Sequence, residues 1–287
     1  MSAVVKAFFD EMTNTVTYVV GDPVARVCAI IDPVLDFDPV SGRTSTASAD
    51  EAIGYIKGNG FEAAWILETH AHADHLSAAQ YFKQQVGGKT AIGKFITATQ
   101  AIFKDVFNLG DEFTADGKQF DKLLDDGDVL GFGGEKIRVM HTPGHTPAFV
   151  TFVIGDCAFV GDTLFMPDFG TARVDFPGGD AATLYRSIHR ILELPGETRL
   201  FMCHDYKAPG REHYSWETTV AEQRLGNVHI HEGISEQEFV AFRTRRDADL
   251  GMPKLILPSI QVNIRGGEMP PAEDNGVVYL KLPVDAL

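Results

Sequence analysis

A dense run of metal-binding side chains directly follows an apolar stretch near residue 70. Residues 64–67 read Ala-Trp-Ile-Leu, and residues 69–76 have the sequence THAHADHL, with three imidazoles and one carboxylate. Histidine is the commonest metal ligand in proteins, and imidazole combined with carboxylate suits zinc, iron, nickel or manganese. A solvated polar loop with ordinary histidines does not account for this density. The segment therefore predicts a metal site at the end of a buried strand.

Other apolar stretches of the chain also end in metal-ligand residue types. His145 lies in the turn HTPGHTP at residues 141–147, Asp162 follows the apolar residues 158–160, and His204 follows residues 199–203. In layered α/β folds, sites form where strand ends meet, so we expect one pocket. Two ions would lie about 3.5–4 Å apart and share a carboxylate. The ligands suffice for one or two divalent ions: His70, His72, Asp74, His75, His145, Asp162 and His204.

Composition limits the class of protein and its partners. The chain has 287 residues, 44% of them hydrophobic, which predicts a folded globular protein with a sizeable core. A formal net charge of −15 argues against nucleic acid as a partner. No apolar stretch approaches the ~20 residues that span a bilayer, and the N-terminus lacks a signal pattern. We expect a cytoplasmic protein that binds no membrane, with its three cysteines reduced and buried.

The pattern of apolar and turn residues predicts alternating strands and helices. We expect residues 1–250 to form one domain and residues 251–287 a C-terminal extension, irregular and packed on that domain. Residues 32–48 read as a loop, because they are rich in Pro, Asp, Ser and Thr. The expected strands are 15–20, 25–31, 63–67, several within 129–160, and 199–203; the expected helices are 50–57, one beginning near 77, 180–192, 216–225 and 235–246.

The order of these motifs resembles the metallo-β-lactamase superfamily. The match rests on THAHADH, on TPGHT at residues 142–146, on Asp162 within VGDT, and on His204, and together these motifs span most of the chain. The resemblance implies the α/β class and an αββα sandwich, in which two mixed β-sheets are flanked by helices and the metals lie at one edge.

Further residues resemble the glutathione persulfide dioxygenases, or sulfur dioxygenases, of the bacterial type. They are residues 170–176 (GTARVDF), the helix with residues 183–185 (TLY), residues 204–206 (HDY) and the proline-rich tail. Ala148 departs from the family, where Gly commonly follows TPGHTP. The resemblance implies oxidation of glutathione persulfide with O₂ to sulfite and glutathione, in sulfide detoxification. It also implies one Fe(II) per chain held by His70, His145 and Asp162, a metal-free second ligand set of Asp74, His75 and His204, and His72 beside that set.

Two residues are candidates for binding glutathione, which carries two carboxylates. Arg173 can grip a carboxylate through two hydrogen bonds, and Tyr206 offers a hydroxyl donor two residues after His204. The alternative for Arg173 is a structural salt bridge with Asp175 or Asp168. Arg243, with its neighbour Arg246, is expected on a solvated helix face.

The ligand set leaves other functions open. A dinuclear zinc hydroxyacylglutathione hydrolase of the glyoxalase II type would use all seven ligands, with zinc in place of iron and a hydroxide made from metal-bound water. A catalytically silent metal-binding module is a third hypothesis, against which the intact ligand set argues. A homodimer is expected only because homodimers are common.

Overall fold

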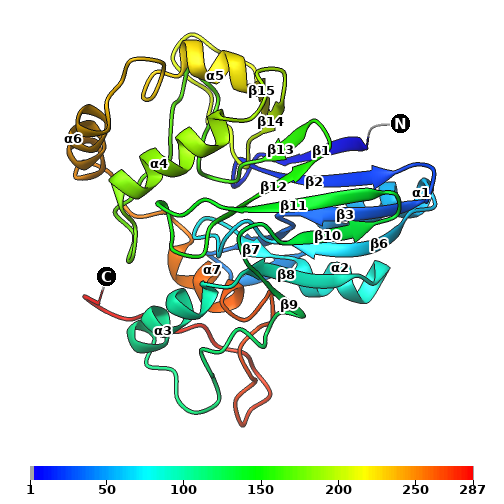
Figure 1. Cartoon of the computed structure of the whole chain (residues 1–287). Coiled ribbons are helices and arrows are strands. Elements are labelled where there is room, and N and C mark those ends of the chain that lie inside the picture. The colour runs from blue at the N-terminus through cyan, green and yellow to red at the C-terminus, as the bar shows by residue number, and fades with distance from the viewer. Residues whose placement is uncertain (1–2, 287) are drawn as a thin grey trace.

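Two six-stranded sheets lie face to face in the computed structural model, which describes residues 3–286 (Figure 1). In the first sheet an antiparallel part is followed by a parallel part. Its strands, in spatial order, are β1 (Val4–Asp10), β2 (Thr15–Asp22), β3 (Val27–Ile31), β6 (Glu62–Leu67), β8 (Lys89–Gly93) and β9 (Lys122–Leu124).

The second sheet is antiparallel except for the parallel pair β13 and β14. Its strands follow the chain order: β10 (Val129–Phe132), β11 (Glu135–His141), β12 (Val150–Ile154), β13 (Cys157–Phe159), β14 (Arg199–Phe201) and β15 (Glu217–Thr219). A small third sheet joins β5 (Arg43–Ser45), β4 (Val34–Asp38) and β7 (Leu76–Ser77).

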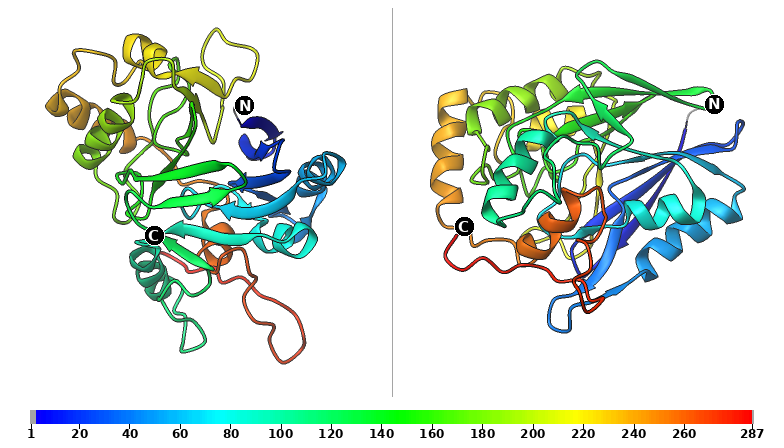
Figure 2. Two further views of the ribbon diagram at one scale, coloured as in Figure 1. Left: turned by 45° about the vertical axis from the view of Figure 1, so that its right-hand side comes forward. Right: turned by 90° about the horizontal axis from the view of Figure 1, so that it is seen from below.

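The main core fills the space between the two large sheets. Val16, Tyr18 and Leu67 from the first sheet pack against Phe152 and Phe159 from the second, all buried. Burial of such side chains contributes about 1.5–3 kcal/mol each. The predicted α/β class and αββα sandwich are confirmed, because helices cover the outer faces of both sheets (Figure 2).

Helices α1 (Ala47–Gly58) and α2 (Ala79–Val86) pack on the first sheet, where Ile56 and Phe82 meet Ile30 and Ile66. On the second sheet, Leu184 and Ile188 of α4 (Ala181–Leu192) belong to one buried cluster with Ala158 and Leu200. Helices α5 (Val220–Gly226) and α6 (Glu236–Asp247) adjoin α4. Helices α3 (Ile96–Val106) and α7 (Ile256–Asn263) pack against each other through Phe103 and Ile260.

The structure corrects three local predictions. Residues 32–48, expected as a loop, contain β4 and β5 and the start of α1. The helix expected over 216–225 is strand β15 followed by α5, because Glu217–Thr219 pairs with β14 at the sheet edge. The tail, expected as irregular, contains α7. Pro258 is the third residue of this helix, where a backbone N–H would have no intrahelical acceptor, so the helix tolerates the proline.

The division at residue 250 stays a prediction, although α7 packs directly against β7. The expected burial of the cysteines holds, since Cys28, Cys157 and Cys203 are all buried and unpaired. Within residues 3–286, no helix has the length and apolarity to cross a membrane.

Candidate metal centre

Three side chains from different loops meet at one edge of the sandwich. His70 follows β6, His145 lies in the turn between β11 and β12, and Asp162 follows β13. Their ligand atoms all lie within 4.8 Å of one another, and all three residues are buried. The Oδ2 atom of Asp162 is 3.8 Å from Nε2 of His70 and 3.7 Å from Nε2 of His145. The structure thus brings together the residues that the resemblance assigns to one metal ion.

Hydrogen bonds on the far side of each imidazole turn Nε2 toward this centre. Nδ1 of His145 lies 2.7 Å from the carbonyl oxygen of Arg173, which can only accept, so Nδ1 carries the proton. The Thr69 hydroxyl donates to Asp32 at 2.9 Å and accepts from Nδ1 of His70 at 3.1 Å. In both rings Nε2 therefore keeps its lone pair, and such outer bonds are typical of metal-binding histidines.

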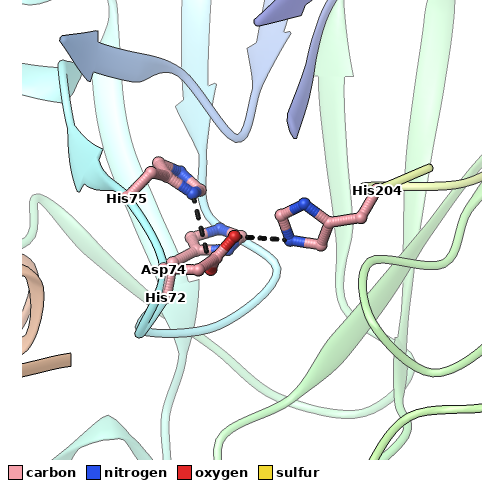
Figure 3. Close-up of side chains that lie close together, drawn as sticks. All are labelled: His72, Asp74, His75 and His204. Atoms are coloured by element: carbon pink, nitrogen blue, oxygen red, sulfur yellow. Dashed lines mark ion pairs between the residues drawn. The ribbon is translucent and has the colours of Figure 1, made fainter. Parts of the chain in front are cut away.

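A second group of ligand types lies beside the first and consists of His72, Asp74, His75 and His204 (Figure 3). Nε2 of His204 is 3.2 Å from Oδ2 of Asp74 and 3.1 Å from Oδ1 of Asp162, so this imidazole lies between two carboxylates. Nδ1 of His75 is 3.7 Å from Oδ1 of Asp74. Asp162 of the first group therefore contacts His204 of the second group.

His72 is held from outside this cluster. Its Nε2 atom lies 3.0 Å from Oδ1 of Asp32 and 3.4 Å from Oε2 of Glu68, and all three residues are buried. Its Nδ1 atom has no hydrogen-bond partner within residues 3–286. His72 can therefore serve either as a ligand or as a neighbour of the ligands.

The donor atoms fit a divalent cation. In the part of the chain that the structure describes, six buried atoms of the cluster lack a hydrogen-bond partner: Nε2 of His70, Nδ1 of His72, Oδ2 of Asp74, Nε2 of His75, Oδ1 of Asp162 and Nε2 of His204. An unsatisfied buried polar group costs about 1–3 kcal/mol. These unpartnered atoms, spread over the two adjoining groups, are donor types that suit one or two divalent cations.

Burial and charge divide the histidines into two kinds. Burial lowers the pKa of His70 well below its usual value and also lowers that of His145. Burial acts in the same direction on His204, but the carboxylates of Asp162 and Asp74 outweigh it and raise its pKa to about 9. At neutral pH His70 and His145 can therefore offer lone pairs, whereas His204 carries a proton between two carboxylates.

The two predicted substrate contacts lie in different surroundings. The guanidinium of Arg173 donates two hydrogen bonds of 2.6 Å to Asp175 and one of 2.7 Å to the carbonyl of Gly251. The salt-bridge alternative is thus realised, although it does not exclude a role in binding. Tyr206 is 41% exposed, and its ring stacks on His204 at 5.6 Å, so it lies at the rim of the centre.

A small cavity adjoins His145. Its volume is about 20 Å³, close to the 10–15 Å³ or more that one water molecule requires. The lining is mostly apolar: Ala71, Ala73, Thr99, Phe103, His145, Thr146, Phe176, Pro177, Ile256 and Ile260.

Sequence reasoning missed the residues that support the ligands. Asp32 and Glu68 were not singled out, although Asp32 directly follows β3 and so repeats the pattern of a strand followed by a ligand type. Arg243 is 2% exposed rather than solvated, because it pairs with the buried Asp247 and donates to the carbonyl of Thr171 at 3.0 Å. No spacing pattern in the sequence indicates that the ion pair of Arg243 and Asp247 is buried.

Comparison with known proteins identifies the family. Residues 16–204 match the metallo-beta-lactamase superfamily, so the chain belongs to this superfamily. A probable metallo-hydrolase of Burkholderia pseudomallei is 56% identical over 99% of both chains. Glyoxylase B2 of Dictyostelium discoideum is 50% identical over 99% of this chain and 98% of its own.

Persulfide dioxygenases are among the relatives too. The mitochondrial persulfide dioxygenase ETHE1 of Homo sapiens is 31% identical over 93% of this chain and 89% of its own. The crystal structure of ETHE1 from Myxococcus xanthus superposes with a TM-score of 0.73 at 27% identity, covering 92% of this chain and all of that one. The resemblance to this group that the motifs predict is confirmed. The fold and the superfamily make the chain a metallo-hydrolase-fold enzyme, and the clustered ligand types are consistent with a metal-binding site.

Proposed function

We propose that this protein is an Fe(II)-dependent dioxygenase that oxidises glutathione persulfide with O₂ and water to sulfite and glutathione. The observation that carries the proposal is the convergence of His70, His145 and Asp162 on one point. Two histidines and one carboxylate on one face, with open positions, are the arrangement of non-heme iron oxygenases. Ferrous iron held there supplies the redox chemistry between O₂ and the terminal sulfur.

The position of His204 favours one ion over two. Its Nε2 atom lies within 3.2 Å of a carboxylate oxygen of both Asp74 and Asp162, the residues that would bind a second metal. In the metal-free protein a protonated imidazole balances these carboxylates, so a second cation would have to displace its proton.

A dinuclear zinc hydroxyacylglutathione hydrolase is the second candidate. It is favoured by the 50% identical relative named glyoxylase B2 and by the presence of all seven ligand side chains. Both candidates act on a glutathione derivative, so metal content and reaction separate them.

Purification without oxygen and without added metal tests the proposal. We expect about one iron per chain, O₂ consumption with glutathione persulfide, and one sulfite formed for each O₂ consumed. S-lactoylglutathione, offered to the same preparation, serves as the control substrate. Two zinc ions per chain together with rapid thioester cleavage would establish the hydrolase and refute the dioxygenase.

Tyr206 gives a test of the substrate's position. Its ring stacks on His204 and its side chain is partly exposed, so its hydroxyl can donate to a glutathione carboxylate. A hydrogen bond to a charged group contributes about 1.5–3 kcal/mol. We expect Tyr206→Phe to raise KM for the persulfide about 10-fold or more, with iron content unchanged. Tyr81→Phe is the control, because the Tyr81 hydroxyl donates to Asp50 at 2.7 Å and Tyr81 belongs to none of the groups of ligand types. Equal KM values in all three proteins would remove Tyr206 from the substrate site.

A further inference from the structure

The side chain of Asn263, at the end of α7, lies against the backbone of the metal-binding loop. Its Nδ2 atom donates to the carbonyls of His72 and His75, both at 2.8 Å. Its Oδ1 atom accepts from the N–H of Ser77 at 2.8 Å. The side chain is only 4% exposed, so both donors and one acceptor of the amide are used inside the protein.

The loop depends on such contacts because it has no regular structure of its own. Residues 71–75 lie between β6 and β7 and belong to no helix or strand. Buried carbonyl and N–H groups there need partners from elsewhere. Asn263 supplies hydrogen-bond partners at both ends of the turn that carries Asp74. Ala73, in the middle of that turn, packs in the hydrophobic cluster of Ile256 and Ile260.

Other contacts fix the end of α7 itself. Gln100 of α3 donates to the carbonyl of Ile264 at 2.8 Å, and Gln80 of α2 donates to the carbonyl of Gly266 at 2.9 Å. A side chain at Gly267 would approach the carbonyl oxygen of Ser77 to 3.1 Å, so the backbone is close here as well. Asn263 is therefore presented by a segment that is held at several points.

We propose that Asn263 is a positioning residue that sets the geometry of the metal site through the backbone of residues 72–77. It contacts no reacting atom. It acts by fixing the carbonyls of His72 and His75, the residues that flank Ala73 and Asp74 in the chain. The inference rests on the proposed metal site and holds for one ion or two: loosening this loop moves His70, two residues before His72, and with a second ion it also moves Asp74 and His75. It also assigns a role to the C-terminal segment, whose last helix completes the loop.

Metal affinity of an Asn263→Ala variant tests this inference without an activity assay. We expect Zn²⁺ and, under anaerobic conditions, Fe²⁺ to bind about 10- to 100-fold more weakly, the loss typical of residues that orient metal ligands. Competition with a chromophoric chelator gives the affinity. Urea unfolding of the metal-free protein gives the stability separately. If Asn263→Ala does not fold, Asn263→Leu replaces it, because Leu fills the cavity without burying a charge and makes none of the three hydrogen bonds.

Gln261 of the same helix provides a matched control. It is 2% exposed and also makes three hydrogen bonds, donating to the carbonyls of Leu257 and Lys281 and accepting from the N–H of Lys281, with no contact to the loop. We expect Gln261→Ala to lower stability comparably and to change metal affinity by less than about threefold, well short of the loss expected at Asn263. Equal affinities in Asn263→Ala and wild type, or equal losses in both variants, would overturn the inference. A wild-type protein that binds neither metal would instead refute the proposed metal site.

Discussion

Protein carrying Asp162→Ala is expected to retain no metal through purification. It should bind added Fe²⁺ at least about 100-fold more weakly, which equals or exceeds the largest loss of metal affinity typical of residues that only orient ligands. Within residues 3–286, Asp162 is the one carboxylate that faces His70, His145 and His204 together, at 3.8, 3.7 and 3.1 Å. Without it two imidazoles remain, which is too few for a stable site. Elemental analysis of protein purified without added metal makes the measurement.

Asp121→Ala is the control for that experiment. Asp121 is a partly exposed carboxylate that pairs with Lys83 at 2.7 Å and lies outside every group of ligand types. We expect the control protein to keep its metal. An Asp162→Ala protein with full metal content would show that the ion is bound elsewhere, and would remove the basis of the proposed dioxygenase.

The ligands could be predicted because each follows an apolar strand by a few residues. Covalent connection fixes His70 near the end of β6, Asp162 near the end of β13 and His204 near the end of β14, and the layering of the sheets then brings these ends together. The fold class follows from the same alternation of apolar strands and helices. Asp32 obeys the same rule after β3 and could have been found in this way.

The supporting contacts could not be predicted, because they join residues far apart in the chain. Asn263 reaches the carbonyl of His72 across 191 positions, and Gln100 reaches that of Ile264 across 164. Amide side chains that bind backbone atoms leave no spacing pattern. Helix α7 was missed for a related reason: contacts with Phe103 and its neighbours stabilise it, whereas its prolines suggest a loop.

Gly144, the residue before His145, shows how closely the site depends on the packing of α4. Its φ angle of +140° lies in a region that side chains rarely adopt. A Cβ atom there would lie 2.4 Å from Cα and 2.5 Å from N of Leu184. The Gly144 carbonyl also accepts from the N–H of Asp180 at 2.8 Å, so the turn and the start of α4 form one unit.

We expect Gly144→Ala to lower the free energy of unfolding by about 3–5 kcal/mol, the sum of backbone strain and overpacking. Metal affinity should fall as well, because any movement that relieves the clash shifts His145. Gly233→Ala separates the two causes, since Gly233 has a φ of +96°, also outside the left-handed helical region, but nothing within 4 Å of the added Cβ, and should cost only about 1–3 kcal/mol. Urea denaturation of both variants makes the comparison. Equal losses would mean that backbone conformation alone, and not the contact with α4, requires glycine before His145.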